Sequence, residues 1–151
     1  MHVVLFQPEI PPNTGNVARL CAAMQVSLHL IEPLGFKLED RYLKRAGLDY
    51  WPHVDIAVWP DLDAYIRNSG AGRRLVLTSA RRGAALHRFE FTENDSLVFG
   101  RETSGLPPEV IGLSPHHVRI PIKGEVRSIN LSTAAGIVLF QALVSAGLVG
   151  E

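Results

Sequence analysis

Short apolar runs alternate with helical patterns along the chain, and this alternation limits the possible folds more than any other feature. Runs rich in Val, Leu and Ile predict β-strands at His2–Phe6, Leu28–Ile31, Asp55–Val58, Leu75–Thr78, Ser96–Phe99 and Val118–Ile120. The patterns between them predict helices at Thr14–Met24, Glu39–Ala46, Leu62–Asn68, Pro107–Leu113 and Asn130–Ala146. Because strands that alternate with helices favour parallel pairing, we predict an α/β fold with a mostly parallel sheet flanked by helices on both faces.

The length fits a single domain over residues 1–151, since domains usually contain ~100–200 residues. Cys21 is the only cysteine, so an internal disulfide is excluded and a reducing compartment is favoured. The N-terminus lacks the features of a targeting segment, and the apolar stretch Ala134–Gly150 is shorter than the ~20 residues of a membrane span. We therefore expect a cytoplasmic protein that does not enter a membrane.

The final predicted helix is apolar on almost every side. From Ala134 to Val144 only Gln141 is polar, while Ile137, Phe140 and Val144 recur along one side. A helix that is apolar all round is buried all round, and each large side chain left in water forgoes ~1.5–3 kcal/mol. A terminal helix of a small domain has one side on its own sheet and another facing outward. We therefore predict a homodimer through this helix, with burial inside one chain as the alternative.

The first predicted helix follows two prolines. Pro11 and Pro12 favour extended backbone, and Asn13 or Thr14 would then cap the free amides at the helix start. The spacing i, i+3, i+4, i+7 predicts a buried stripe of Val17, Leu20, Cys21 and Met24. Asn16 and Arg19 are three residues apart and share another side of the helix.

Several classes of site have no support in the sequence. The chain contains no G-x-G-x-x-G, no P-loop motif and no G-x-S-x-G. His116 and His117 are adjacent, with no further ligand cluster nearby, so we expect no metal.

The charge of the chain neither supports nor excludes a nucleic-acid partner. The formal net charge is zero. Only Lys37, Lys44 and Lys123 are lysines, so the other basic residues are arginines, whose planar fork suits phosphate. A high GC content of the genome is an alternative cause of this excess of arginine over lysine.

Three segments dense in Gly, Pro, Asn and Ser stand where predicted strands end: Pro8–Arg19, Phe99–Pro107 and Ile120–Ser132. Loops at the carboxyl ends of parallel strands are where open α/β sheets bind ligands. Each segment alone also fits an ordinary turn or helix cap. In the second segment, Gly100 and Gly105 would let the backbone approach a flat ligand closely.

In this order, the segments resemble the SPOUT methyltransferases. They read P-x-I-P-x-N-x-G-N-x-x-R, then G-x-E-x-x-G-L-P, then I-P-x-x-x-x-x-S-x-N-L-S before the final helix. Ile31–Phe36 and Lys44–Tyr50 are also similar to the minimal tRNA ribose 2′-O-methyltransferases that act on the wobble nucleotide. The resemblance covers residues 2–148. It implies a C-terminal trefoil knot, no additional RNA-binding domain and a dimer that uses the last helix.

The resemblance also implies a cofactor, S-adenosylmethionine, which leaves as S-adenosylhomocysteine. The implied cofactor-binding residues are Leu77, Thr78, Gly100, Glu102, Gly105, Ile120, Ile122, Ser128 and Leu131. The implied catalytic residues are Arg19, Asn16 and Asn130. The implied substrate is the ribose of cytidine or 5-carboxymethylaminomethyluridine at the wobble position of a tRNA anticodon arm.

Arg19 matches the arginine proposed as catalytic in the family, but an arginine keeps its proton up to pH ~12. We therefore expect Arg19 to orient the ribose and stabilise the developing 2′-oxyanion as a clamp. Asn16 would fix the ribose or Arg19.

Two positions depart from the subgroup: Arg101 stands where proline is common and Ser104 where arginine is frequent. Candidate phosphate contacts are Arg41, Arg45, Arg81, Arg82 and Arg127.

Three alternatives remain on the sequence alone. The enzyme could modify another tRNA site or ribosomal RNA, or the chain could be a catalytically silent RNA-binding dimer. A small-molecule nucleotide-binding protein is the third. The joint presence of Asn16, Arg19, Ser128 and Asn130 argues against the silent dimer.

Overall fold

The sheet is parallel throughout its described pairs. The computed structural model describes residues 1–39, 41, 45 and 53–150. Its seven-stranded sheet has the order β3-β2-β1-β6-β4-β7-β5, and each neighbouring pair runs parallel. The strands are β1 (His2–Phe6), β2 (Ser27–Ile31), β3 (Ile56–Trp59), β4 (Arg74–Thr78), β5 (Ala84–Ala85), β6 (Asp95–Phe99) and β7 (His117–Arg119). The predicted α/β fold is confirmed, while the trefoil knot stays a prediction from the resemblance.

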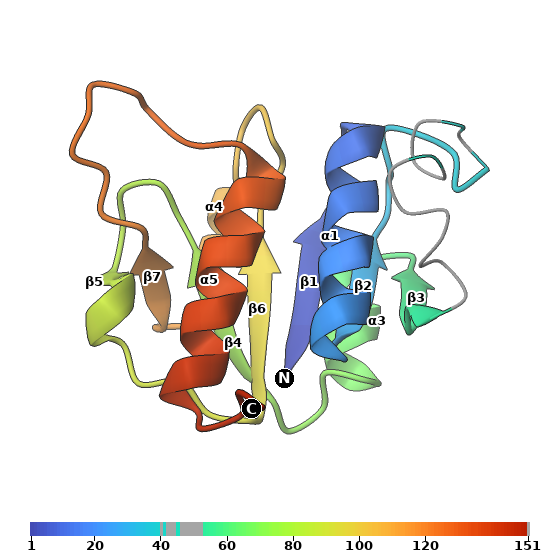
Figure 1. The fold of residues 1–151 in the computed structure, drawn as a ribbon. Coiled ribbons are helices and arrows are strands. Elements are labelled where there is room, and N and C mark those ends of the chain that lie inside the picture. Colours follow the sequence, from blue (N-terminus) through green and yellow to red (C-terminus); the bar gives the residue numbers. More distant parts are fainter. Residues whose placement is uncertain (40, 42–44, 46–52, 151) are drawn as a thin grey trace.

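Helices cover both faces of the sheet. The helices with described bounds are α1 (Pro11–Met24), α3 (Leu62–Arg67), α4 (Pro108–Ile111) and α5 (Leu131–Ser145), with a short 3-10 helix η2 at Leu86–Arg88. Helices α1 and α5 pack side by side on one face, and α3 and α4 lie behind the sheet (Figure 1). The helix predicted at Glu39–Ala46 falls mostly outside the described residues, as does most of the run Lys44–Tyr50. Among the described helices, none is long and apolar enough to cross a membrane.

The central strands are mostly apolar because both faces of the sheet are buried, and His29 in β2 and Ser96 in β6 are buried polar exceptions. Val3 and Leu5 of β1 pack in the cluster under α1 and α5, whereas Val4 and Phe6 pack with residues of α3 and α4. Successive residues of a strand point to opposite faces, so a sheet covered on both sides favours apolar residues at consecutive positions. This is the pattern from which the strands were predicted.

The start of α1 corrects one expectation. The helix begins at Pro11 instead of Thr14, and Ile10 at the N-cap makes no side-chain capping bond. Proline suits the first helical positions because the amide it lacks has no partner there anyway. Asn13 and Thr14 therefore lie inside the first turn and are buried, so the prediction that one of them caps the helix was wrong.

The predicted buried stripe of α1 is only partly correct. Val17 and Cys21 are fully buried, and Leu20 is half-buried against the core. Burial raises the pKa of the Cys21 thiol to about 12, which fits its predicted place as a small core residue. Met24 departs from the prediction, since it is 37% exposed at the last turn of the helix.

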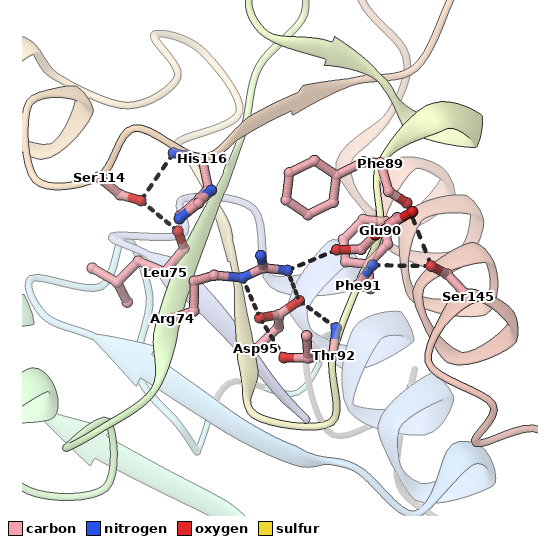
Figure 2. A network of polar contacts seen from close by, with 10 residues as sticks. All are labelled: Arg74, Leu75, Phe89, Glu90, Phe91, Thr92, Asp95, Ser114, His116 and Ser145. Atoms are coloured by element: carbon pink, nitrogen blue, oxygen red, sulfur yellow. Dashed lines mark hydrogen bonds and ion pairs between the residues drawn. The ribbon is translucent and has the colours of Figure 1, made fainter.

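An ion pair joins the amino ends of β4 and β6. The Nε of Arg74 donates to Oδ1 of Asp95 at 2.7 Å, and its Nη2 donates to Oδ2 at 2.8 Å and to the Glu90 carbonyl at 2.8 Å (Figure 2). Beside it, the N–H of Phe91 donates to Oγ of Ser145 at the end of α5. The pair therefore fixes two central strands, and the loop that carries Glu90 and Phe91 ties them to the last helix.

Candidate functional site

A cavity of about 730 Å³ lies beyond the carboxyl ends of β4, β6 and β7. It is lined by residues from three loops, together with Ile10 and Asn13 at the start of α1 and the first turns of α5. In Figure 1 the chain after β7 arches above these strand ends before it enters α5. The loops after β6 and β7 contain two of the segments that the sequence singled out, and Ile10 and Asn13 belong to the first, so all three segments meet at this cavity together with the loop after β4. This is the usual position of a ligand site in an open α/β sheet.

The loop after β6 is closed tightly on itself. Arg101 and Gly105 exchange backbone hydrogen bonds of 3.2 and 2.9 Å. A Cβ at Gly100 would lie 2.4 Å from the carbonyl carbon of Gly105, and Gly105 itself has a φ of +69°. Only glycine satisfies both conditions without strain. The loop therefore lines the cavity with backbone that carries no side chain at these two positions.

A short turn after β4 carries two arginines at the rim of the cavity. Oγ of Ser79 accepts the N–H groups of Arg81 and Arg82 at 3.3 and 3.2 Å. Gly83 follows at a φ of +89°, where a Cβ would lie 2.1 Å from the carbonyl oxygen of His117. Both arginine side chains are exposed, and neither has an ion-pair partner within the part of the chain that the structure describes. The turn thus holds two uncompensated cations beside the cavity.

Asn130 connects the start of α5 to the start of α1. Its Oδ1 accepts the N–H groups of Ser132 at 2.8 Å and Thr133 at 3.3 Å, which caps the helix. Its Nδ2 donates to Oδ1 of Asn13 at 2.9 Å. Both asparagines line the cavity. One side chain therefore satisfies the helix start and fixes a second polar group at the site.

The loops after β1 and β6 are linked by an exchange of carboxylates. Glu102 accepts the N–H of Glu9 at 3.1 Å and the N–H of Ile10 at 2.6 Å. In return, Glu9 accepts the N–H of Thr103 at 3.0 Å and its hydroxyl at 2.8 Å. The two bonds from Thr103 lower the pKa of Glu9. The ionised form of Glu9 therefore favours this link.

The predicted site residues gather with three exceptions. All of the predicted cofactor residues except Leu77 line the cavity, and so does Asn130. Leu77 is fully buried in the core cluster beneath α3 and α4. Arg19 and Asn16 are exposed on α1 and do not belong to the lining of this chain's cavity. Their catalytic roles stay predictions.

Sequence reasoning missed Asn13 as a site residue. Asn13 belongs to the same Asn-Thr-Gly-Asn stretch as Asn16, but it was interpreted as a helix cap. The structure turns it into the cavity and exposes Asn16 instead. The signal that could have identified Asn13 was the pair of prolines. In a helix that starts at Pro11, Asn13 lies inside the first turn, whereas in a helix that starts at Thr14 it would precede the helix as a cap. Among the described residues no group of His, Cys, Asp and Glu is arranged to hold a metal ion.

Comparison with known proteins covers nearly the whole chain. Residues 1–140 match the SpoU rRNA Methylase family. The tRNA (cytidine(34)-2′-O)-methyltransferase of Methylovorus glucosotrophus is 46% identical over 142 residues, which are 93% of this chain and 92% of that protein. The protein of the same name from Burkholderia cenocepacia is 44% identical over 152 residues, which are 99% of this chain and 97% of that protein.

Solved structures agree. One, described as giving insights into the 2-OH methylation of C/U34 on tRNA, is 48% identical with a TM-score of 0.91, over 95% of this chain and 94% of that chain. An AdoMet-bound rRNA methyltransferase from Sinorhizobium meliloti is 26% identical with a TM-score of 0.88, over 99% of this chain and 57% of that chain. A family match over most of the chain, near-full-length relatives and the same fold lead to one conclusion: this chain belongs to the SpoU methylase family.

Proposed function

We propose that this chain transfers a methyl group from S-adenosylmethionine to the ribose 2′-hydroxyl of the wobble nucleotide of tRNA. The proposed nucleotide is a cytidine or a uridine at position 34, in agreement with the names of the relatives. The family resemblance specifies the uridine as 5-carboxymethylaminomethyluridine. One observation carries the proposal: relatives named for this reaction match the chain over nearly all of their length and its own. A tRNA substrate also fits the cytoplasmic location expected from the sequence.

The cavity suits S-adenosylmethionine in size and in chemistry. Its volume of about 730 Å³ lies within the ~300–1,000 Å³ usual for small-molecule sites. The side-chain-free edge at Gly100 and Gly105 would take the flat adenine, with Ile120 and Leu131 as apolar walls. When bound, S-adenosylmethionine supplies an electrophilic methyl group on a sulfonium centre.

The chain's own contribution is to orient the ribose and to stabilise charge. Asn13 and Asn130 are held by their mutual hydrogen bond at the cavity wall, where they are placed to contact the ribose or its neighbours. Fixing a reactant in line accounts for much of the rate of such transfers. Arg19, as a permanent cation, is proposed to stabilise the 2′-oxygen as it loses its proton, with Asn16 beside it on α1.

The arginines at the rim are proposed to contact RNA phosphate. Arg81 and Arg82 project from the turn after β4, and Arg127 lines the cavity from the loop before α5. Clustered cations on a protein of zero net charge attract RNA phosphate at one place on the surface, while the protein as a whole does not attract it. Each phosphate contact releases counterions, so tRNA binding should weaken steeply with salt. Arg41 and Arg45 are exposed and remain further candidates.

We also propose that two chains pair through α5. Ile137, Phe140 and Val144 are 42%, 51% and 49% exposed on the outer side of this helix, whereas Val138 and Leu139 on its inner side are buried. Contiguous exposed apolar surface on a small domain marks an interaction site. We propose that a second copy of the same helix covers this face, because an apolar face can be buried against an identical apolar face in a symmetric dimer.

The test is transfer of labelled methyl from S-adenosylmethionine to total tRNA, followed by mass spectrometry of the modified nucleotide. A 2′-O-methyl pyrimidine at position 34 supports the proposal. Label at another position moves the target to a different tRNA site, and label only in ribosomal RNA moves it to that substrate. Calorimetric binding of tRNA without any transfer would instead support the silent RNA-binding dimer.

A further inference from the structure

Besides the carboxylate exchange, a third connection joins the loops after β1 and β6. Nε of Arg101 donates to Oε1 of Gln7 at 2.8 Å, and Nη2 of Arg101 donates to the same oxygen. We call the whole set of contacts between residues 7–10 and residues 101–103 the interlock. The side chains of Gln7 and Arg101 are both partly buried, whereas the bonds from Thr103 to Glu9 are exposed to water. The Arg101–Gln7 bond is therefore less exposed to competition from water than the bonds from Thr103 to Glu9.

The surroundings hold the Arg101 guanidinium in one place. Its Cζ lies 5.2 Å from the centroid of the Phe6 ring, within the range of a cation–π contact. Phe6 is the last residue of β1 and is 7% exposed, so the ring is a fixed platform. A planar guanidinium stacked on this ring has few other orientations in which it can still reach Gln7.

Gln7 is the residue at which the chain leaves β1. Its φ of +50° is uncommon for a residue with a side chain. A conformation of this kind persists only where neighbouring groups determine it. The backbone N–H of Gln7 donates to the carbonyl of Ile31, and Arg101 holds its side chain. The direction of the chain from β1 into α1 thus depends on a contact with the loop after β6.

We propose that Gln7 and Arg101 are positioning residues for methyl transfer, an inference that rests on the proposed function. Their bond keeps the start of α1, and with it Asn13, in register with the loop that binds the cofactor. Gln7 does not itself line the cavity, while Arg101 does. A loss of activity on changing Gln7 therefore reports on position and not on a lost substrate contact.

The test compares Arg101→Ala and Gln7→Ala in steady-state methylation of tRNA. Each variant is expected to lower kcat at least tenfold, while the dissociation constant for S-adenosylhomocysteine changes less than threefold. The double variant should be no slower than the slower single variant, because both changes remove one interaction. Gln7→Glu keeps an acceptor for the guanidinium and should stay within threefold of wild type.

Arg67→Ala is the matched control, because it also removes an arginine paired to a neighbouring side chain, on the surface of α3. It should leave kcat unchanged. Should Gln7→Ala not fold, Gln7→Met against Gln7→Glu carries the same comparison. Wild-type activity in Gln7→Ala, or equal losses in Gln7→Ala and Gln7→Glu, would overturn the proposal. A raised KM for tRNA in Arg101→Ala alone would also overturn it, since that pattern means a direct RNA contact.

A second readout does not depend on activity. The amides of Ile10 and Thr103 donate across the interlock, so their hydrogen exchange should be at least tenfold faster in Gln7→Ala and Arg101→Ala than in Arg67→Ala. Unchanged exchange would overturn the positioning role. If wild type does not methylate tRNA but exchange behaves as expected, the proposed function fails and the interlock stands.

Discussion

Asn130 and Asn13, 117 positions apart in the chain, meet through a single hydrogen bond of 2.9 Å from Nδ2 of Asn130 to Oδ1 of Asn13. The same Asn130 side chain caps α5 with its oxygen. Its two ends therefore have separable roles, one in stability and one at the cavity, and substitution can remove either.

Asn130→Asp should separate these roles. An aspartate keeps the oxygen that caps α5, so the free energy of unfolding should change by less than ~0.5 kcal/mol. It cannot donate to Asn13, so we expect kcat to fall roughly tenfold, a change of ~1.4 kcal/mol in the barrier. Asn130→Ala is the reference, because it also loses the cap and should be ~1 kcal/mol less stable. Full activity in Asn130→Asp would show that the bond to Asn13 is not needed.

Arg19→Ala should abolish methylation while the dimer and cofactor binding remain. Because Arg19 is exposed and lies outside the lining of its own cavity, we expect it to serve the cavity of the partner. Co-expression with Gly100→Ala, a variant whose cofactor loop cannot close normally, then restores one intact site per mixed dimer. Random pairing predicts recovery of about a quarter of wild-type activity. No recovery would place Arg19 at the cavity of its own chain.

Phe140→Asp should dissociate the dimer. A charge without a partner in an apolar contact is costly, so the mass from light scattering should fall from two chains to one. Leu113→Asp is the control, since Leu113 is 53% exposed but lies away from α5. A Phe140→Asp protein that is still dimeric would remove α5 from the interface.

The two ion pairs of the described residues should differ greatly in their effect on stability. Asp95 is fully buried, and Asp95→Ala leaves Arg74 without its ion-pair partner, so we expect a loss of ~3 kcal/mol in urea unfolding. The carboxyl of Asp63, paired with Arg67 on α3, is 73% exposed, and Asp63→Ala should cost less than ~0.5 kcal/mol. Equal effects would mean that the Arg74–Asp95 pair does not fix the two strands.

Acid should destabilise the protein through His29. Burial lowers the pKa of His29 to about 4, from 6.5 in the unfolded chain. The unfolded state therefore takes up a proton that the folded state refuses as the pH falls from 6.5 towards 4, and stability falls over that range by ~2 kcal/mol. His29→Gln keeps an acceptor for Nε1 of Trp59 and should show a flatter profile in chemical unfolding between these pH values. A parallel profile would assign the acid sensitivity to other groups.

The sequence predicted the central strands well because burial on both faces leaves short runs that are mostly apolar. It missed β5, since Ala84 and Ala85 are too few and too small to form such a run. The cavity was predictable at the level of loops, because the carboxyl ends of parallel strands share one edge of the sheet. The positions of individual side chains were less predictable. Leu77 and Thr78 are neighbours, yet the pleat sends Leu77 into the core and leaves Thr78 at the cavity.

Contacts between distant segments were beyond the sequence. Nothing in the spacing of Gln7 and Arg101 indicates that their side chains meet, because β1 and β6 become neighbours only in the folded sheet. The departure from the family pattern at Arg101 was visible, but its partner was not. The proposed roles of Arg19 and Asn16 likewise involve a second chain or bound RNA, which spacing in one sequence does not reveal.

Helix α5 has a consequence for how activity follows the amount of protein. Its first turn forms part of the cavity wall, and three residues on its outer side form the proposed contact with a second chain. Because Arg19 is expected to serve the cavity of the partner, a chain without a partner would carry an incomplete site, so specific activity should fall on dilution below the dissociation constant of the dimer. In a growing cell, the total methylation activity would rise more steeply than the number of chains when chains are few. It would become proportional to that number only once most chains are paired.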